Sequence, residues 1–406
     1  MRLLRAALLL LAIAGGSATA RAQDDFGPPL FEEVWTLFKG KFYDRTMNGV
    51  DWEALRKKYL PAAKAAQTPE AVREVVQALL GELKASHSAL IREDVFRAHY
   101  MLMSKGRLVP QWGFTLSKHG EGYYVQEVLP GSPADAAGLL RGDRLLAVED
   151  TPAELAELAP ELWDAGLGGP RPYRIGVPEA GESVRLELER FPNSERGLFR
   201  VTLTAAEWSL LEACLASRQV YTREGFKIGY VHLYTFLMDE VADLTGDFLT
   251  TTLSDADAVI LDLRGMGGLE RVLERILGYL DPNSGSCLWG KPTVALIDPR
   301  TRSAKEVFAF HLKDRKLATL VGQTTAGAVI GANFMPLKDG STVLVPAVDM
   351  RAITGGHVLE AVGVSPDVEV DNPLPYARGV DAIRERGLEV ITEQLRVLRR
   401  QKAKLY

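Results

Sequence analysis

The chain has 406 residues, of which 47% are hydrophobic and 25% charged, so it is long enough for two or three domains with cores of their own. This composition excludes disordered, collagen-like and disulfide-framework proteins. The formal net charge of -5 supplies no basic field for nucleic acid, and six His with two Cys are too few for a multi-zinc array. We therefore expect no nucleic-acid partner.

The first 22 residues have the pattern of a secretory signal peptide. Arg2 and Arg5 precede an apolar run over 6–14, and Ala20 or Ala22 would end the cleavage site. A membrane anchor needs about 20 apolar residues, roughly twice this run. We expect export to the periplasm or the exterior, with no stable membrane span. Cys214 and Cys287 could form one disulfide there, but two cysteines fix no framework, and we treat them as unpaired.

Helical periodicity dominates residues 25–105. Apolar side chains recur at helical spacing from Phe31 to Phe42. A second helix is predicted from Thr68 as N-cap and Pro69 as its first residue, with a buried stripe from Val72 to Leu83. These residues are predicted to form an N-terminal helical domain.

Short strands and Gly/Pro turns replace this pattern at about Leu108 and predict a small β-rich module over residues 108–191. From about residue 200 to 376, strands alternate with helices, which predicts an α/β domain with a mostly parallel sheet. Its functional site is expected at the carboxyl ends of strands, just after Leu263 and Ile297. Residues 377–406 form a last helix whose basic end we interpret as a solvated helix terminus.

Two segments of the α/β region carry candidate chemistry. A glycine-rich turn, Arg264-Gly265-Met266-Gly267-Gly268, closes a buried strand, and its N–H groups could hold an anion or an oxyanion. It is not a phosphate loop, because the Gly-Lys-Ser/Thr ending is missing. Ser303 stands at the start of a predicted helix, but Ser303-x-x-Glu306 also matches a capping box, in which the hydroxyl attacks nothing.

Histidines are the natural bases for a serine nucleophile. His87 follows the helix that ends its apolar stripe at Leu83, where a lone histidine is usually a cap or a surface residue. His357, after Gly355-Gly356, is a second and weaker candidate. The other four, His99, His119, His232 and His311, are not part of any catalytic motif that the sequence shows.

Taken in chain order, the motifs resemble the serine peptidases of the S41 family, the C-terminal processing and tricorn group. The resemblance rests on Asp51-Trp52, Asp262-Leu263-Arg264 with Gly267-Gly268, Ser303-x-x-Glu306, Val321-Gly322-Gln323-Thr324-Thr325 and Gly363-Val364-Ser365-Pro366-Asp367. It covers nearly the whole mature chain. It implies an α/β multidomain protein with an N-terminal helical domain, a PDZ-like β module and an α/β catalytic domain of the ClpP/crotonase-like class. It implies no metal and no cofactor.

The β module resembles a PDZ domain, in which a loop followed by a strand binds the carboxylate end of a peptide. The segment in the place of that loop is Trp112, Gly113, Phe114, Thr115 and Leu116. Protein or peptide substrates held by their C-terminal ends are the partners that the resemblance implies. The oligomeric state stays open.

Two catalytic designs occur in this group. The Ser-Lys design places a lysine in a Gly-Lys-Gly turn, and the matching turn here has Ala328 at that position. The resemblance therefore implies the tricorn design, in which Ser303 is the nucleophile and His87 the base. Ser86 and Glu360 would steady the histidine. Gly267, Gly268 and the N–H of Ala304 would form the oxyanion hole.

Two departures from the family pattern keep a rival open. Met266 stands where the family usually has Asn, and Ala304 follows the serine where the tricorn pattern has an acidic residue. The first hypothesis is an exported serine endopeptidase that captures substrates through its PDZ domain. The rival is a catalytically degenerate PDZ adaptor in which Ser303 is only a cap. A third reading, a binder of a small apolar ligand, rests on the resemblance of retinoid-binding proteins to this fold.

Overall fold

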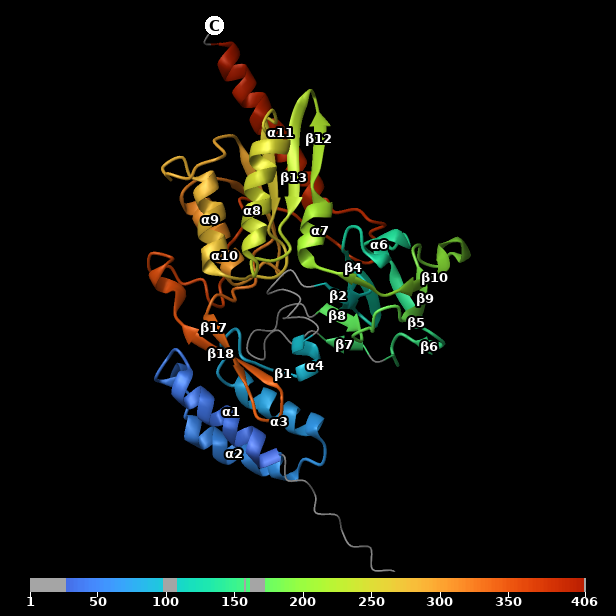
Figure 1. Ribbon diagram of the computed structural model, residues 1–406, viewed down its shortest axis with the longest axis vertical. Coiled ribbons are helices and arrows are strands. Elements are labelled where there is room, and N and C mark those ends of the chain that lie inside the picture. Colours follow the sequence, from blue (N-terminus) through green and yellow to red (C-terminus); the bar gives the residue numbers. More distant parts are fainter. Residues whose placement is uncertain (1–26, 98–107, 157, 161–171, 405–406) are drawn as a thin grey trace, which may run out of the picture.

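The computed structural model describes residues 27–97, 108–156, 158–160 and 172–404 (Figure 1). The predicted signal peptide and His99 lie outside these ranges. Three bodies follow one another in Figure 1: helices α1–α3 at one end, the β module at the side, and the α/β domain at the other end. Within the described ranges, no helix has the length and apolar character needed to cross a membrane.

The N-terminal region contains the expected helices and one more. Helices α1 (Gly27–Lys41) and α3 (Pro69–Gly81) confirm the periodicity, and Thr68 Oγ1 caps α3 by accepting the Ala71 N–H. Helix α2 (Trp52–Ala65) was not predicted separately. Asp51 caps it, and Trp52 stacks on Trp35 while each indole N–H donates to the other residue's carbonyl at 3.1 Å. The Asp51-Trp52 motif therefore fixes α2 against α1.

This helical region does not close its core alone. Strand β1 (Ala89–Ile91) pairs with β18 (Thr342–Val348), which pairs with β17 (Gly331–Pro336). The hairpin of β17 and β18 lies beside the helices in Figure 1, and its Leu337, Val343 and Val345 enter their core. The predicted boundary at residue 105 is thus too simple, because residues 331–348 of the predicted catalytic domain pack with the N-terminal helices.

The β module is a sheet with strand order β10-β9-β5-β4-β3-β8-β7. It is longer than predicted, because β10 pairs with β9 along its whole length and β11 then pairs with β2 in a separate two-stranded sheet, so the module reaches Trp208 and not Phe191. Its elements are β2 (Val109–Gln111), β3 (Phe114–His119), β4 (Gly122–Val128), α6 (Pro133–Ala136), β5 (Arg144–Val148), β6 (Thr151–Pro152), β7 (Leu158–Pro160), β8 (Pro172–Ile175), β9 (Ser183–Glu189), β10 (Leu198–Thr204) and β11 (Ala206–Trp208).

The α/β domain has a six-stranded sheet of order β12-β13-β14-β15-β16-β19, parallel except for β12. Its strands are β12 (Gln219–Arg223), β13 (Phe226–His232), β14 (Ala258–Asp262), β15 (Thr293–Ile297), β16 (Thr319–Gly322) and β19 (Val368–Glu369). Its helices are α7 (Leu210–Ser217), α8 (Asp239–Asp247), α9 (Glu270–Leu280), α10 (Ala304–Asp314) and α11 (Ala382–Ala403). The remaining short helical elements are η1 (Met47–Gly49), α4 (Glu93–Val95), η3 (Glu195–Gly197), η4 (Phe248–Thr252) and η5 (Met350–Ala352).

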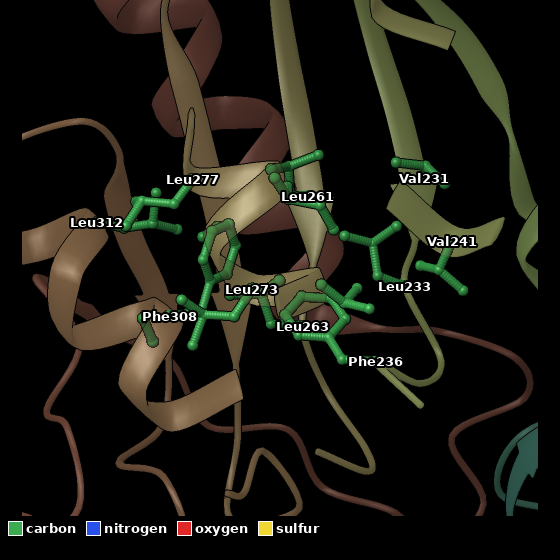
Figure 2. Packing of buried hydrophobic residues seen from close by; sticks show 14 of the residues in the cluster. Val231, Leu233, Phe236, Val241, Leu261, Leu263, Leu273, Leu277, Phe308 and Leu312 are labelled. Carbon is green, nitrogen blue, oxygen red and sulfur yellow. The ribbon is translucent and has the colours of Figure 1, made fainter. Parts of the chain in front are cut away.

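Alternate strand residues face the two helical layers. Leu261 and the following Leu263 pack with Phe308 of α10 and Leu273 of α9, as Figure 2 shows. Ile260 faces the opposite layer, which is formed by α11. Because both faces are covered, the central strands β14 and β15 are buried throughout. The sheet is therefore a rigid support for the loops at its edge.

Candidate active site

Parallel strands end at one edge of the sheet, and four loops meet there. They follow β13, β14, β15 and β16, after His232, Asp262, Ile297 and Gly322. The segments that follow Leu263 and Ile297, where we expected the functional site, both lie at this edge. The edge therefore holds the glycine-rich turn and Ser303.

Ser303 has an unusual backbone. Its φ of 56° and ψ of -131° lie where side chains other than glycine are strained, and such residues cluster at active sites. The Glu306 carboxylate accepts the Ser303 N–H at 3.2 Å, as in a capping box, but the Glu306 N–H donates to the Ser303 carbonyl oxygen at 2.8 Å. An ordinary N-cap has an extended backbone. The geometry thus favours a strained strand-to-helix turn that presents a serine, as in nucleophile elbows.

The glycine-rich turn lies against this serine. A Cβ on Gly267 would lie 2.4 Å from the Ser303 Cβ and 3.1 Å from the Ala304 nitrogen. Gly268 lies against the Phe236 backbone, where a Cβ would be 2.1 Å from a carbonyl carbon. Within the described ranges, the N–H groups of Gly267 and Ala304 donate no hydrogen bond. Two unused donors therefore flank Ser303.

Met266 takes part in packing. Its side chain packs on a small cluster that contains Ala89, Ile91 and Leu344. Met266, which stands where the family usually has Asn, thus makes an apolar contact between the turn and strands β1 and β18. The backbone donors of the turn do not depend on that side chain.

Glu360, Ser86 and His87 form a hydrogen-bonded chain between segments 274 residues apart. Ser86 donates its N–H to Glu360 Oε1 at 2.7 Å and its Oγ–H to Oε2 at 3.0 Å. The Ser86 Oγ lies 2.9 Å from His87 Nδ1. Because the hydroxyl proton of Ser86 points to Glu360, its oxygen accepts from Nδ1–H, which leaves Nε2 as the basic nitrogen of His87.

The charge of Glu360 is partly desolvated. Burial raises the pKa of its carboxyl, while the N–H groups of Ser86, Val329 and Ile330 act in the opposite direction. His87 has a φ of 60°, so it shares with Ser303 a backbone region that is rare for side chains other than glycine. Both residues are half-buried.

The turn that carries Ala328 connects the nucleophile to this chain. Ser303 donates its N–H to the Ala328 carbonyl at 2.8 Å. The next residue, Val329, donates its N–H to Glu360 Oε2 at 2.9 Å. Glu360 thus ties the turn beside Ser303 to the loop of His87. Ala328 itself is buried and carries no base.

Glu306 has a role that its capping pattern does not reveal. Its Oε1 accepts from Thr325 Oγ1 and the Gly327 N–H, and its Oε2 from the Ala328 N–H at 2.7 Å. Burial raises the pKa of this carboxyl to about 7. The first turn of α10 therefore holds the Ala328 turn, a contact that only the pairing of distant segments creates.

A buried polar cluster lies beneath the glycine-rich turn. Arg264 forks onto Asp262 and Asp381, and its carbonyl oxygen lies 2.8 Å from His232 Nε2 and 3.4 Å from Lys305 Nζ. Lys305 is fully buried, and burial lowers its pKa to about 7. The motif Asp262-Leu263-Arg264 was recognised in the sequence, but its contacts with Asp381, His232 and Lys305 were not predicted.

The peptide-binding segment of the β module is only partly open. Strand β3 pairs with β4 on one edge and with β8 on the other, where Leu116 faces Tyr173 and Ser117 faces Pro172. The register of β8 includes neither Phe114 nor Thr115. A small cavity beside them is lined by Gln111, Trp112, Gly113, Phe114, Arg174, Gly176, Val177 and Pro178.

The remaining candidates lie elsewhere. His357 is exposed and contacts Phe310, His119 contacts Tyr124, and His311 lies in α10 beside Phe310. In the described part of the chain, no group of three or more His, Cys, Asp and Glu side chains is arranged to hold a metal ion. Cys214 and Cys287 have free thiols.

Three family models match parts of this chain. The model of peptidase family S41 matches residues 277–370, that of the tricorn protease C1 domain matches residues 29–81, and that of the PDZ domain matches residues 124–160. The S41 match contains Ser303 and Glu360. The tricorn match ends six residues before His87.

Relatives extend over most of the chain. A tricorn protease homologue of Streptomyces coelicolor is 27% identical over 90% of this chain and 32% of its own length. A carboxyl-terminal-processing protease of Synechocystis is 26% identical over 85% of this chain and 81% of its own length. The solved structure of the photosystem II D1 C-terminal processing protease aligns with 87% of this chain and 97% of its own, with a TM-score of 0.54 and 21% identity.

The chain thus spans about a third of the tricorn relative and about four fifths of the C-terminal processing relative. It is a homologue of the S41 serine peptidases of the C-terminal processing and tricorn group, with a PDZ domain between its N-terminal helices and its α/β domain.

Proposed function

We propose that this protein is an exported serine endopeptidase that uses a tricorn-like Ser-His-Glu site. The observation that carries the proposal is the hydrogen-bonded chain from Glu360 through Ser86 to His87, with contacts of 2.7 to 3.0 Å. This chain presents the basic nitrogen of an imidazole, the arrangement that activates a serine hydroxyl near neutral pH.

In the proposed reaction, Ser303 Oγ attacks the carbonyl carbon of the scissile peptide bond while His87 Nε2 takes the hydroxyl proton. The N–H groups of Gly267 and Ala304 stabilise the oxyanion that forms. His87 then gives the proton to the leaving amine, and an acyl-enzyme on Ser303 remains. Water, deprotonated by His87, hydrolyses that ester and regenerates the serine. Gly268 contributes by allowing the turn to lie against Phe236.

Labelling by a serine-directed phosphonate tests the nucleophile. We expect one equivalent of label on Ser303, found by mass spectrometry, and none on Ser303→Ala. Labelling should fall strongly in His87→Ala, because the hydroxyl then lacks its base. Failure of the intact protein to react would favour the non-catalytic PDZ adaptor.

Substrate capture by the PDZ domain is the second part of the proposal. The φ of Gly113 is +87°, and its Cβ position is filled by Ser132, so the loop at Trp112–Phe114 keeps its backbone shape only with glycine there. Backbone donors of this loop would receive a peptide carboxylate, and Arg174 beside it adds positive charge. Strand addition would use Phe114 and Thr115, since β8 occupies the edge from Leu116.

Peptides that differ only at their ends test this capture. An apolar peptide with a free carboxylate should bind the full-length Ser303→Ala protein at least about tenfold more tightly than its amide, because charge-assisted hydrogen bonds are lost in the amide. Equal affinities would contradict carboxylate recognition.

Export is tested at the N-terminus of the mature protein. We expect the chain recovered from outside the cytoplasm to begin at Arg21 or Gln23, after Ala20 or Ala22. Recovery of a chain that still begins at Met1 would contradict cleavage.

A further inference from the structure

A cavity of about 210 Å³ lies between the β module and the α/β domain, apart from Ser303. Strand β4 contributes Glu127, the turn before β5 contributes Arg141, and α11 contributes Arg384. The loops after β14 and β15 add Arg264 and Arg300. Four guanidinium groups from four separate segments thus line one cavity, which is rare without negative partners.

Two of the four arginines are neutralised inside the protein. Arg264 forks onto Asp262 and Asp381. Arg300 pairs with Glu127 at 3.2 Å and with Asp298 at 2.9 Å. Glu127 and Asp381 at the cavity are therefore already engaged by arginines, and Asp135, which also lines it, accepts the Gly131 N–H at 2.8 Å.

Arg141 has hydrogen bonds but no carboxylate. Its guanidinium donates to the carbonyl oxygens of Asn372, Pro373 and Val380 at 2.9 to 3.0 Å. In the described ranges, no Asp or Glu oxygen lies within 4.0 Å of it. Burial, together with the positive charges of Arg264 and Arg300, lowers the pKa of Arg141.

Arg384 has neither. Its Nε is buried and has no hydrogen-bond partner, and its guanidinium forms no ion pair with any described residue. The group lies 5.9 Å from the centre of the Tyr230 ring. It belongs to the first turn of the 22-residue helix α11, whose N-terminus adds partial positive charge. Asp381 supplies negative charge nearby but is already forked by Arg264, and the buried Nε–H of Arg384 stays unbonded, so this donor is left for an anion in the cavity.

We propose that the cavity binds one small oxyanion, a phosphate or a carboxylate, held by Arg141 and Arg384. Guanidinium groups offer paired N–H donors that match the oxygens of both anions. The bound anion would join the turn before β5 to the start of α11. It would thereby hold the PDZ domain against the α/β domain.

Titration calorimetry on the full-length protein tests the site. Sodium phosphate and sodium acetate are titrated separately at constant ionic strength, with sodium chloride as the blank. We expect saturable binding of one equivalent of at least one of the two. The anion that binds identifies the source: phosphate alone means a phosphate ligand, and acetate alone means a carboxylate.

Variants assign the binding to the two arginines. Arg384→Met and Arg141→Met should each weaken binding by about tenfold or more, the usual effect of losing a hydrogen bond to a charged group. The matched control is Arg386→Met, two residues further along α11, where Arg386 pairs with Glu389 on the surface. It should bind like the unchanged protein.

Arg384→Met is decisive, because it removes no hydrogen bond or ion pair from the described structure, so loss of binding in a folded variant reports the site. The absence of saturable heat for both anions, or equal affinity in Arg384→Met, would overturn the proposal. The inference does not depend on catalysis: Ser303→Ala should bind the anion with unchanged affinity.

Discussion

Gly267 and Ser303 lie in direct contact, and only a glycine permits it. Any larger residue at position 267 would place its Cβ 2.4 Å from the Ser303 Cβ and 2.7 Å from the Arg302 carbonyl oxygen. Real Cβ contacts essentially never fall below 3.0 Å. The turn after β14 and the turn after β15 are thus fitted to each other at the point where an oxyanion would be held.

Gly267→Ala is therefore expected to abolish most of the peptidase activity. The added methyl group must push Ser303 or the turn away, which separates the nucleophile from its N–H donors. Loss of such a donor costs about 10²- to 10³-fold in kcat. Steady-state kinetics with circular dichroism checks this. Gly285→Ala is the control, since nothing lies within 4 Å of its added Cβ, and it should keep normal turnover.

Ser303→Ala should remove hydrolysis while lowering the free energy of unfolding by less than about 0.5 kcal/mol. The reason is that the Glu306 N–H, which a capping hydroxyl would accept, already donates to the Ser303 carbonyl oxygen at 2.8 Å. Ser209→Ala is the matched control, because Ser209 Oγ accepts the Glu212 N–H at 3.2 Å in a complete capping box. That variant should lose about 0.5–2 kcal/mol and keep its activity. If urea unfolding showed a loss of stability in Ser303→Ala while its turnover was unchanged, Ser303 would be a cap.

These two serines show where local sequence stops being informative. Both stand three residues before a glutamate at the start of a helix, and the pattern predicts a cap at each. Ser209 has the extended backbone of a cap, with a φ of -130°, whereas Ser303 has a φ of 56°. The difference comes from the Ala328 carbonyl, which binds the Ser303 N–H from a turn 25 residues later.

Much of the fold was nevertheless predictable. Thr293–Ile297 is a continuous apolar run bounded by turn residues, and it forms the central strand that was expected. The pairing of Ala89 with Leu344 was not predictable, since neither short segment indicates a partner more than 250 residues away. The same limit applies to Lys305, whose burial depends on the turn carrying Arg264 and on Phe236.

His87→Ala should lower kcat by at least about 10²-fold, the contribution of a positioned general base. His357→Ala is the control, because its exposed ring contacts Phe310 and lies outside the chain of Glu360 and Ser86. A His87→Ala enzyme that keeps more than about a tenth of its turnover would contradict the role of His87. Ala328→Lys should not restore activity to it, since a lysine there belongs to the other catalytic design.

Glu360→Gln is expected to lower turnover by about 10²-fold or more while the fold persists. Every group that bonds Glu360 is a donor, namely the N–H groups of Ser86, Val329 and Ile330 and the Ser86 hydroxyl. An amide must therefore place its NH₂ against a donor. If it turns the Ser86 hydroxyl toward His87 Nδ1, the imidazole takes the tautomer in which Nε2 carries the proton and cannot act as base.

A matching pH effect is expected for Glu360. Burial raises the pKa of its carboxyl, so acidification protonates Glu360 above the usual range of a glutamate and has the same effect as the amide. The activity of the unchanged enzyme should therefore fall as the pH drops through this range. Glu369→Gln, at an exposed glutamate, is the control and should leave the pH profile unchanged. A Glu360→Gln enzyme with normal kcat would remove Glu360 from the catalytic chain.

Lys305→Met should change how stability depends on pH. Burial lowers the pKa of Lys305 to about 7, whereas the unfolded chain keeps this proton until about pH 10.5. Between these values the unfolded state binds more protons, so the contribution of Lys305 makes the folded state more stable as the pH rises, by up to about 1.4 kcal/mol per unit. Below pH 7 both states are protonated and the slope vanishes.

Urea unfolding at pH 7, 8 and 9 measures the difference between the unchanged protein and Lys305→Met, which cancels the titration of all other groups. Lys313→Met, at a lysine of the same helix that reaches the surface, is the control. A difference that stays flat from pH 7 to 9 would mean that Lys305 keeps its charge beneath the glycine-rich turn, where only the Arg264 carbonyl accepts from it among the described residues.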